Sequence, residues 1–319
     1  MKRVLEKTVA GAMDGAMCGM MNALQWQRRD QVCSREEFHA YLAGCAGLSR
    51  EEFYAMPAVA NAAQNGVWME WDTPRPSGFA ENDRVRVRYH ACRKGPSAPT
   101  VLLLHALMSG SDFGYLRLAR WYNERGWNVA FPHLPFHYSR NPKGYWNGLL
   151  AINANLVRNV ETIRQGVVEL RQLMSQLRTK GCREFAMMGT SYGGWNGALL
   201  SFLEPDFRFL ALIQPIVNVE HAIWGNPGSA TMRRLLLDRG FKPWDLGEHV
   251  RICSPLHGIP LCGAERAIIT AGMYDRVSPP GELLTLKHRW PGAKLIHVRQ
   301  GHFGYTALRK TLDAIDHLI

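Results

Sequence analysis

The sequence predicts an α/β fold in which a mostly parallel sheet is flanked by helices. The first observation is a set of short apolar runs, such as residues 101–104 and 267–272, which are typical of strands covered on both faces. The second is a long amphipathic helix expected over residues 153–177, which returns the chain to the sheet. The third is Gly-Thr-Ser-Tyr-Gly at 189–193, placed between an apolar run and an apolar helical segment.

Residues 1–66 are expected to form a helical extension before the sheet. Glycines recur every four residues from Gly11 to Gly19 beside four methionines, which predicts a close helix contact. Packing on the protein's own core, a dimer contact and a membrane-surface helix are the three alternatives for this stripe. Ser34 and Ser49 each begin an S-x-x-E pattern, which is typical of a capping box at a helix start.

From residue 67 the hydrophobic pattern changes to strict alternation. Residues 67–71 and 85–89 alternate as half-exposed antiparallel strands do. A helix is expected over residues 112–124. Further strands are expected at residues 101–104, 128–131, 185–188, 209–216, 267–272 and 295–298.

Ser191 is the candidate nucleophile. It stands in a G-x-S-x-G pattern, where a tight strand-to-helix turn requires small flanking residues, here Gly189 and Gly193. Such a turn exposes the serine at the strand's carboxyl end and directs the backbone amide of Tyr192 to the same place. Ordinary loop glycines are the alternative explanation of the pattern.

Two later strand ends carry an acid and a base. Asp275 follows the run 267–272, and His302 follows the run 295–298. A serine, an aspartate and a histidine in this chain order, each at a strand end, predict a catalytic triad. Glu220, after the preceding strand, is the alternative acid. His297 is the alternative base, although its apolar neighbours favour a core histidine.

These motifs resemble those of the α/β-hydrolase family. The resemblance spans residues 67–319 and rests on residues 189–194, 272–279 and 301–304. It implies that Ser191 attacks the substrate, that His302 accepts its proton and that Asp275 orients the imidazole.

The resemblance also implies an oxyanion hole and a cap. The second oxyanion amide would come from the loop after the first buried strand, at Leu107 or alternatively Met108. The family places a cap between two strands, which here makes residues 217–264 a small helical lid. The hydrolase core would then comprise residues 67–216 and 265–319.

Candidate substrate contacts lie in two loops. His137 and Tyr138, with His133 and Arg140, follow a strand end, where loops line the pocket of open α/β sheets. Local loop packing, with Arg140 paired to a carbonyl or carboxylate, is the alternative. Trp224 is the candidate contact from the lid.

The leading hypothesis is a serine hydrolase that cleaves a carboxylic ester of small or medium acyl size. No dinucleotide, phosphate-loop or zinc-protease motif is present, so neither a cofactor nor a metal is expected. The elbow Gly-Thr-Ser-Tyr-Gly-Gly is also similar to that of prolyl-oligopeptidase-like hydrolases, which leaves a peptidase or amidase open. The N-terminal segment is too short for their propeller. A catalytically silent binding protein is the third hypothesis.

Composition and charge predict the kind of partner that the protein binds and where it is located. The net charge of +11 comes mostly from scattered arginines, which argues against nucleic-acid binding and leaves an anionic substrate open. Seven cysteines without metal-ligand spacing indicate reduced thiols and a cytoplasmic location. Charged residues interrupt the N-terminal apolar stretch, which argues against a signal peptide, and no apolar run is long enough to span a membrane. The sequence leaves homo-oligomerisation open.

Overall fold

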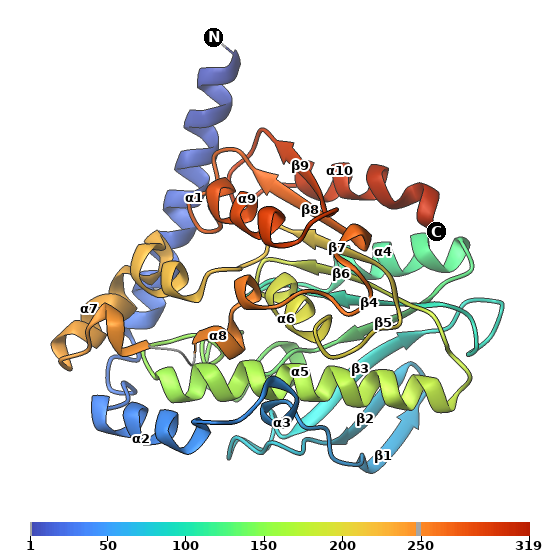
Figure 1. Cartoon of the computed structure of the whole chain (residues 1–319), viewed down its shortest axis with the longest axis horizontal. Helices are drawn as coiled ribbons and strands as arrows, with labels where there is room; N and C mark the ends of the chain where they lie inside the picture. Colours follow the sequence, from blue (N-terminus) through green and yellow to red (C-terminus); the bar gives the residue numbers. More distant parts are fainter. Residues whose placement is uncertain (1, 247–249) are drawn as a thin grey trace.

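The computed structural model describes residues 2–246 and 250–319, without the side chains of Lys2 and Val250. Within these residues nine strands form one sheet, in the order β1-β2-β3-β5-β4-β6-β7-β8-β9 (Figure 1). The strands are β1 Ala60–Asn65, β2 Trp68–Asp72, β3 Arg84–His90, β4 Thr100–Leu104, β5 Asn128–Pro132, β6 Phe185–Thr190, β7 Phe207–Ile213, β8 Ala267–Gly272 and β9 Lys294–Val298.

The sheet is antiparallel at one edge and parallel elsewhere. β1, β2, β3 and β5 pair antiparallel in that order, whereas β5, β4, β6, β7, β8 and β9 pair parallel. The apolar runs of β4, β5 and β8 are buried along their whole length, as strands covered on both faces must be. The carboxyl ends of the parallel strands therefore meet at a single edge.

Helices cover both faces of the sheet (Figure 1). α5 (Leu156–Thr179), α6 (Tyr192–Leu200) and α9 (Pro280–Arg289) contribute to the larger hydrophobic core on one face. α4 (Phe113–Glu124) and α10 (Thr306–Ile315) close a smaller core on the other face. Both layers arise because the strands present apolar side chains on both sides.

The N-terminal helices pack onto the hydrolase-like body. They are α1 (Lys2–Trp26), α2 (Arg35–Cys45) and α3 (Arg50–Phe53), and the predicted capping boxes of α2 and α3 are both formed. α1 stands along one side of the molecule, and its first turns project beyond the body (Figure 1). Its glycine stripe faces open space, so α1 does not pack on the body through these glycines. The buried face is instead that of Asp14 and Cys18.

The segment between β7 and β8 is a series of short helices. They include the turn His221–Gly225, α7 (Ala230–Asp238) and α8 (Val250–Cys253). The remaining single turns are Pro227–Ser229, Pro243–Leu246, Pro255–His257 and Ala264–Arg266, and two further turns elsewhere in the chain are Tyr138–Arg140 and Asp316–Leu318. Residues 247–249 of the predicted cap lie outside the described residues.

Two expectations differ from the structure at the sheet edges. The sequence predicted helices up to residue 66, whereas Ala60–Asn65 forms the edge strand β1. Every residue of β1 is exposed, so no apolar alternation marks it. His297 was expected in the core, but it is exposed because β9 is the other edge of the sheet.

Within the described chain, none of the helices combines the length and the hydropathy that a membrane span requires.

Candidate active site

Ser191 occupies a strained turn between β6 and α6. Its backbone has φ 51° and ψ −111°, a conformation that non-glycine residues rarely adopt and that is held only where the surroundings enforce it. A Cβ atom at Gly189 would lie 2.7 Å from the carbonyl oxygen of Gly193. A Cβ atom at Gly193 would overlap the carbonyl of Leu104 and lie 2.6 Å from that of His105. The turn therefore requires both glycines, as the pattern predicted.

The hydroxyl of Ser191, the imidazole of His302 and the carboxylate of Asp275 form a continuous chain of hydrogen bonds. Ser191 Oγ lies 2.8 Å from His302 Nε2, and His302 Nδ1 lies 2.8 Å from Asp275 Oδ2. A carboxylate only accepts, so Nδ1 carries the hydrogen and Nε2 is left to accept the serine proton. All three side chains are largely withdrawn from solvent.

The second oxygen of Asp275 is held by the backbone. Asp275 Oδ1 accepts hydrogen bonds from the amides of Val277 and Ser278, each at 2.8 Å. Oδ2 accepts from Nε2 of Gln214 at 2.5 Å, in addition to the imidazole. The carboxylate is therefore fixed from three sides.

Gln214 was not predicted as a site residue. Its Nε2 also lies 2.8 Å from the carbonyl of Gly301, and its Oε1 accepts from Gln300 at 2.7 Å. Gln214 thus connects the aspartate loop with the histidine loop. In the sequence, the sign of this role is the amide side chain of Gln214, which comes directly after the apolar run that forms β7.

His105 and His137 organise the loop that follows β4. His105 accepts the amide hydrogen of Leu134 at 3.0 Å, and its Nδ1 lies 3.0 Å from the carbonyl of Ala106. Burial lowers the pKa of His105 well below its usual value, so the ring is neutral. This agrees with its position before the serine in the chain, which is the wrong order for a catalytic base.

The partners of His137 distinguish between the two candidate oxyanion amides. His137 Nδ1 lies 2.8 Å from the carbonyl of Pro135, so it carries the hydrogen, and Nε2 accepts the amide hydrogen of Met108 at 3.3 Å. Burial lowers the pKa of His137 to about 4, which keeps this arrangement neutral. The Met108 amide is thus engaged, whereas the amides of Leu107 and Tyr192 have no partner among the described residues. The His137 ring also stacks on that of Tyr192, with centroids 5.6 Å apart.

Arg140 is a buried structural residue. Its guanidinium makes two hydrogen bonds to Glu169 of α5, at 2.6 and 2.8 Å, and further bonds to the carbonyls of Asn82 and His133. The side chain is completely buried. Arg140 therefore pairs with a carboxylate and carbonyls, as the alternative to substrate contact predicted.

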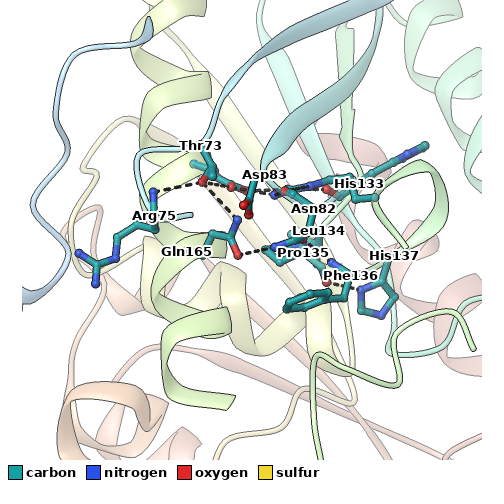
Figure 2. A network of polar contacts seen from close by, with 12 residues as sticks. Thr73, Arg75, Asn82, Asp83, His133, Leu134, Pro135, Phe136, His137 and Gln165 are labelled. Atoms are coloured by element: carbon teal, nitrogen blue, oxygen red, sulfur yellow. Dashed lines mark hydrogen bonds and ion pairs between the residues drawn. The ribbon is translucent and has the colours of Figure 1, made fainter. Parts of the chain in front are cut away.

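Asn82 ties the same loop to α5 (Figure 2). Its Oδ1 accepts the amide hydrogen of Phe136 at 2.7 Å, and its Nδ2 donates to Gln165 at 3.0 Å. Gln165 in turn donates to the hydroxyl of Thr73 at 3.2 Å. The loop after β5 is therefore held by the segment that precedes β3 and by α5.

The predicted contacts Tyr138 and Trp224 are both half-buried. The hydroxyl of Tyr138 lies 2.7 Å from Oγ of Ser109. The indole nitrogen of Trp224 is buried without a hydrogen-bond partner in the described part of the chain. Glu220, the alternative acid, is exposed and makes no hydrogen bond or ion pair with His302 among the described residues.

An apolar cavity of about 60 Å³ lies between the N-terminal helices, α5, α6 and the segment after β7. Its walls come from α2, α5, α6 and the segment after β7, and include Phe38, Ile163, Trp195, Val219 and Ile223. Trp195 lies one helical turn after Ser191, because its backbone amide donates to the carbonyl of Ser191 at 2.9 Å. Ser191, Asp275 and His302 themselves do not line the cavity.

Comparisons with known proteins support the fold. An acetyl xylan esterase from a Thermoanaerobacterium species has a TM-score of 0.56 and 16% identity, over 89% of this chain and 93% of that one. An acetyl xylan esterase from a Paenibacillus species has a TM-score of 0.55 and 11% identity, over 92% of this chain and 98% of that one.

The sequence matches cover only part of this chain. Two uncharacterised proteins of Mycobacterium tuberculosis, from two strains, are 26% identical over 213 residues, or 65% of this chain. The match spans 50% of the length of each of these curated relatives. No protein-family model matches. The sheet order, the strained serine turn and the solved structures together confirm the predicted resemblance at the level of the fold: the chain has the α/β-hydrolase fold.

Proposed function

We propose that the protein is a serine hydrolase that cleaves a carboxylic ester through an acyl-enzyme, without a cofactor or metal. The observation that carries the proposal is the pair of 2.8 Å hydrogen bonds from Ser191 to His302 and from His302 to Asp275. The acetyl xylan esterases of similar fold are ester hydrolases by name, which supports the same reaction class.

The geometry supports a defined sequence of proton movements. His302 Nε2 accepts the hydroxyl proton of Ser191 as the oxygen attacks the substrate carbonyl, and then delivers that proton to the leaving alcohol. Asp275 holds the imidazole in the required tautomer and stabilises the imidazolium. Water then attacks the acyl carbonyl while His302 accepts its proton. The bond to Ser191 Oγ breaks, His302 returns the proton to that oxygen and the acid is released.

The negative charge that develops on the carbonyl oxygen needs two hydrogen-bond donors. We assign these to the backbone amides of Tyr192 and Leu107. Tyr192 is the first residue of α6, so its amide has no carbonyl partner within the helix. Each such donor contributes about 3 kcal/mol to transition-state stability where this has been measured. His137 supports the hole indirectly, because it holds Met108 and stacks on Tyr192.

We propose that the apolar cavity beside Trp195, one helical turn from Ser191, receives a short apolar acyl group. An engineered apolar cavity of about 150 Å³ holds one benzene molecule. A space of about 60 Å³ therefore suits only a few carbon atoms. Residues 217–264 would act as the cap, because Val219, Ala222 and Ile223 of this segment line the cavity. Trp224 and Tyr138 are proposed as further substrate contacts. The seven cysteines, all buried as free thiols, support the predicted cytoplasmic location.

A substrate series tests the proposal. We expect nitrophenyl acetate and butyrate to be hydrolysed, the octanoate to be a much poorer substrate and aminoacyl nitroanilides to be inert. Ser191→Ala should abolish all hydrolysis. Ala222→Leu, which fills the cavity, should reduce activity on the butyrate more than on the acetate. Faster cleavage of the anilides than of the esters would favour a peptidase instead.

A further inference from the structure

A carboxylate from the N-terminal helix reaches the histidine loop. Both oxygens of Asp14, in α1, lie 2.9 Å from the backbone nitrogen of His302, and Oδ1 also accepts from the amide of Phe303 at 3.3 Å. Asp14 and His302 are 288 residues apart in the sequence. The loop that carries the proposed base is thus held by a helix from the opposite end of the chain.

This carboxylate lies in an unfavourable place for a charge. The Asp14 side chain is buried, and this burial raises its pKa, with a smaller contribution from the negative charge of Asp275. The amides of His302 and Phe303 and the charge of His302 lower it, but they offset only part of the effect. Perturbed pKa values cluster at functional sites.

The neighbouring residues leave room for the carboxylate. Position 301 is glycine, and a Cβ atom there would lie 2.5 Å from Asp14 Oδ1. The charged groups that act on Asp14 are Asp275 and His302. Cys18 lies beside Asp14 and is also influenced by Asp275 and Arg276. Cys18 lies one helical turn after Asp14, and burial raises its pKa, so it is a neutral thiol.

We propose that Asp14 is a positioning residue of the site: it fixes the backbone of His302 and provides a second negative charge that favours the imidazolium formed during attack. This inference rests on the proposed function. It makes α1 part of the hydrolytic machinery.

α1 also contacts the segment proposed as the cap. Asn22 Nδ2 donates to the carbonyl of Pro227 at 2.9 Å, and its Oδ1 accepts the amide hydrogen of Thr231 at 2.7 Å. One helix therefore connects this segment with the histidine loop.

The test compares Asp14→Asn with the matched control Asp30→Asn, which removes an exposed aspartate just after α1. For Asp14→Asn we expect kcat on nitrophenyl acetate to fall about tenfold or more with KM within twofold, because small displacements of a catalytic group cost this much. We also expect the acid limb of the kcat/KM profile to move to lower pH, because a negative charge near the imidazole is lost. A purely structural role would leave this limb in place. Asp30→Asn should match the wild type in all respects.

Stability and hydrogen exchange complete the test. The melting temperature of Asp14→Asn should equal or exceed that of the wild type, since an unfavourable buried charge is removed, while the amides of residues 302–303 should exchange faster. Rates are compared at a temperature where every variant is folded by circular dichroism. If the wild type is active and Asp14→Asn has the same kcat and the same pH profile, this inference is wrong, whereas the proposed function is not affected. An inactive wild type overturns the proposed function, and the inference with it.

Discussion

Gln214 donates a hydrogen bond to the oxygen of Asp275 that also accepts from His302. The distances to Asp275 Oδ2 are 2.5 Å from Gln214 Nε2 and 2.8 Å from His302 Nδ1. Gln214 itself has φ 46°, which is rare for a non-glycine residue. The buried amide of Gln214 thus holds this carboxylate, and it also bonds the carbonyl of Gly301 and the side chain of Gln300.

Gln214→Leu should therefore slow hydrolysis without unfolding the protein. The variant removes a hydrogen bond to a charged acceptor, an interaction that contributes about 1.5–3 kcal/mol. We expect kcat to fall by about tenfold and KM to change little in steady-state assays with nitrophenyl acetate. A kcat within twofold of the wild type would show that the backbone amides alone hold Asp275.

Asp275→Asn should have a much larger effect. The amide favours the wrong tautomer of His302, and the equivalent change in another serine hydrolase lowers kcat by about four orders of magnitude. Glu220→Gln is the matched control and should retain activity, because Glu220 is exposed. Retained activity in Asp275→Asn together with a large loss in Glu220→Gln would show that Glu220 is the acid.

Gly193→Ala should destabilise the protein. The added methyl group meets the backbone carbonyls of Leu104 and His105, which cannot move without disturbing β4. Overpacking costs about 1–3 kcal/mol, and more where backbone is involved. Gly114→Ala, where nothing lies within 4 Å of the new atom, should be neutral or stabilising. Thermal melts of the two variants check the contrast, and equal melting temperatures would contradict it.

Removing one partner of the Arg140–Glu169 pair should also be costly. Both side chains are almost completely buried, and Glu169→Ala would leave an uncompensated guanidinium, at a cost of about 3–5 kcal/mol. The exposed pair of Arg234 and Asp238, 4.0 Å apart, is the control, and Asp238→Ala should change stability by less than about 1 kcal/mol. Urea unfolding measures both, and a similar loss in the two variants would refute the assignment.

Stability should decrease as the pH falls below neutral. The pKa of buried His137 is lowered to about 4 from an ordinary value of 6.5. Between these values the unfolded chain binds a proton that the folded chain does not, so the unfolding free energy declines as the pH drops from 6.5 to 4. The shift corresponds to about 3 kcal/mol for this group, and His133, with a pKa of about 3, acts in the same direction. His137→Gln should show a shallower decline in urea unfolding between pH 7 and 5; an equally steep decline would contradict this.

The sequence predicted the parts of the site that local patterns mark. Ser191, Asp275 and His302 each follow a strand that apolar residues identify, and parallel strands bring their carboxyl ends together. The same reasoning located the helices and the inner strands. It did not locate β1, whose residues are all exposed and carry no alternation.

Residues that act across long separations were missed. Asp14 reaches the triad because α1 contacts the loop after β9, and Gln214 reaches it because β7 lies next to β8. Neither contact leaves a pattern in its own segment. Asp14 is one of the charged residues that interrupt the N-terminal apolar stretch, and nothing in its local sequence marks it as a site residue. The role of His137 likewise depends on which backbone groups face its two nitrogens, which spacing does not reveal.

The most direct test of the account is the reaction of Ser191 with a fluorophosphonate, followed by intact mass and peptide mapping. We expect one equivalent of label on Ser191, no label in Ser191→Ala and much slower labelling in His302→Ala. A folded wild type that takes up no label, or that is labelled at another residue, would contradict it.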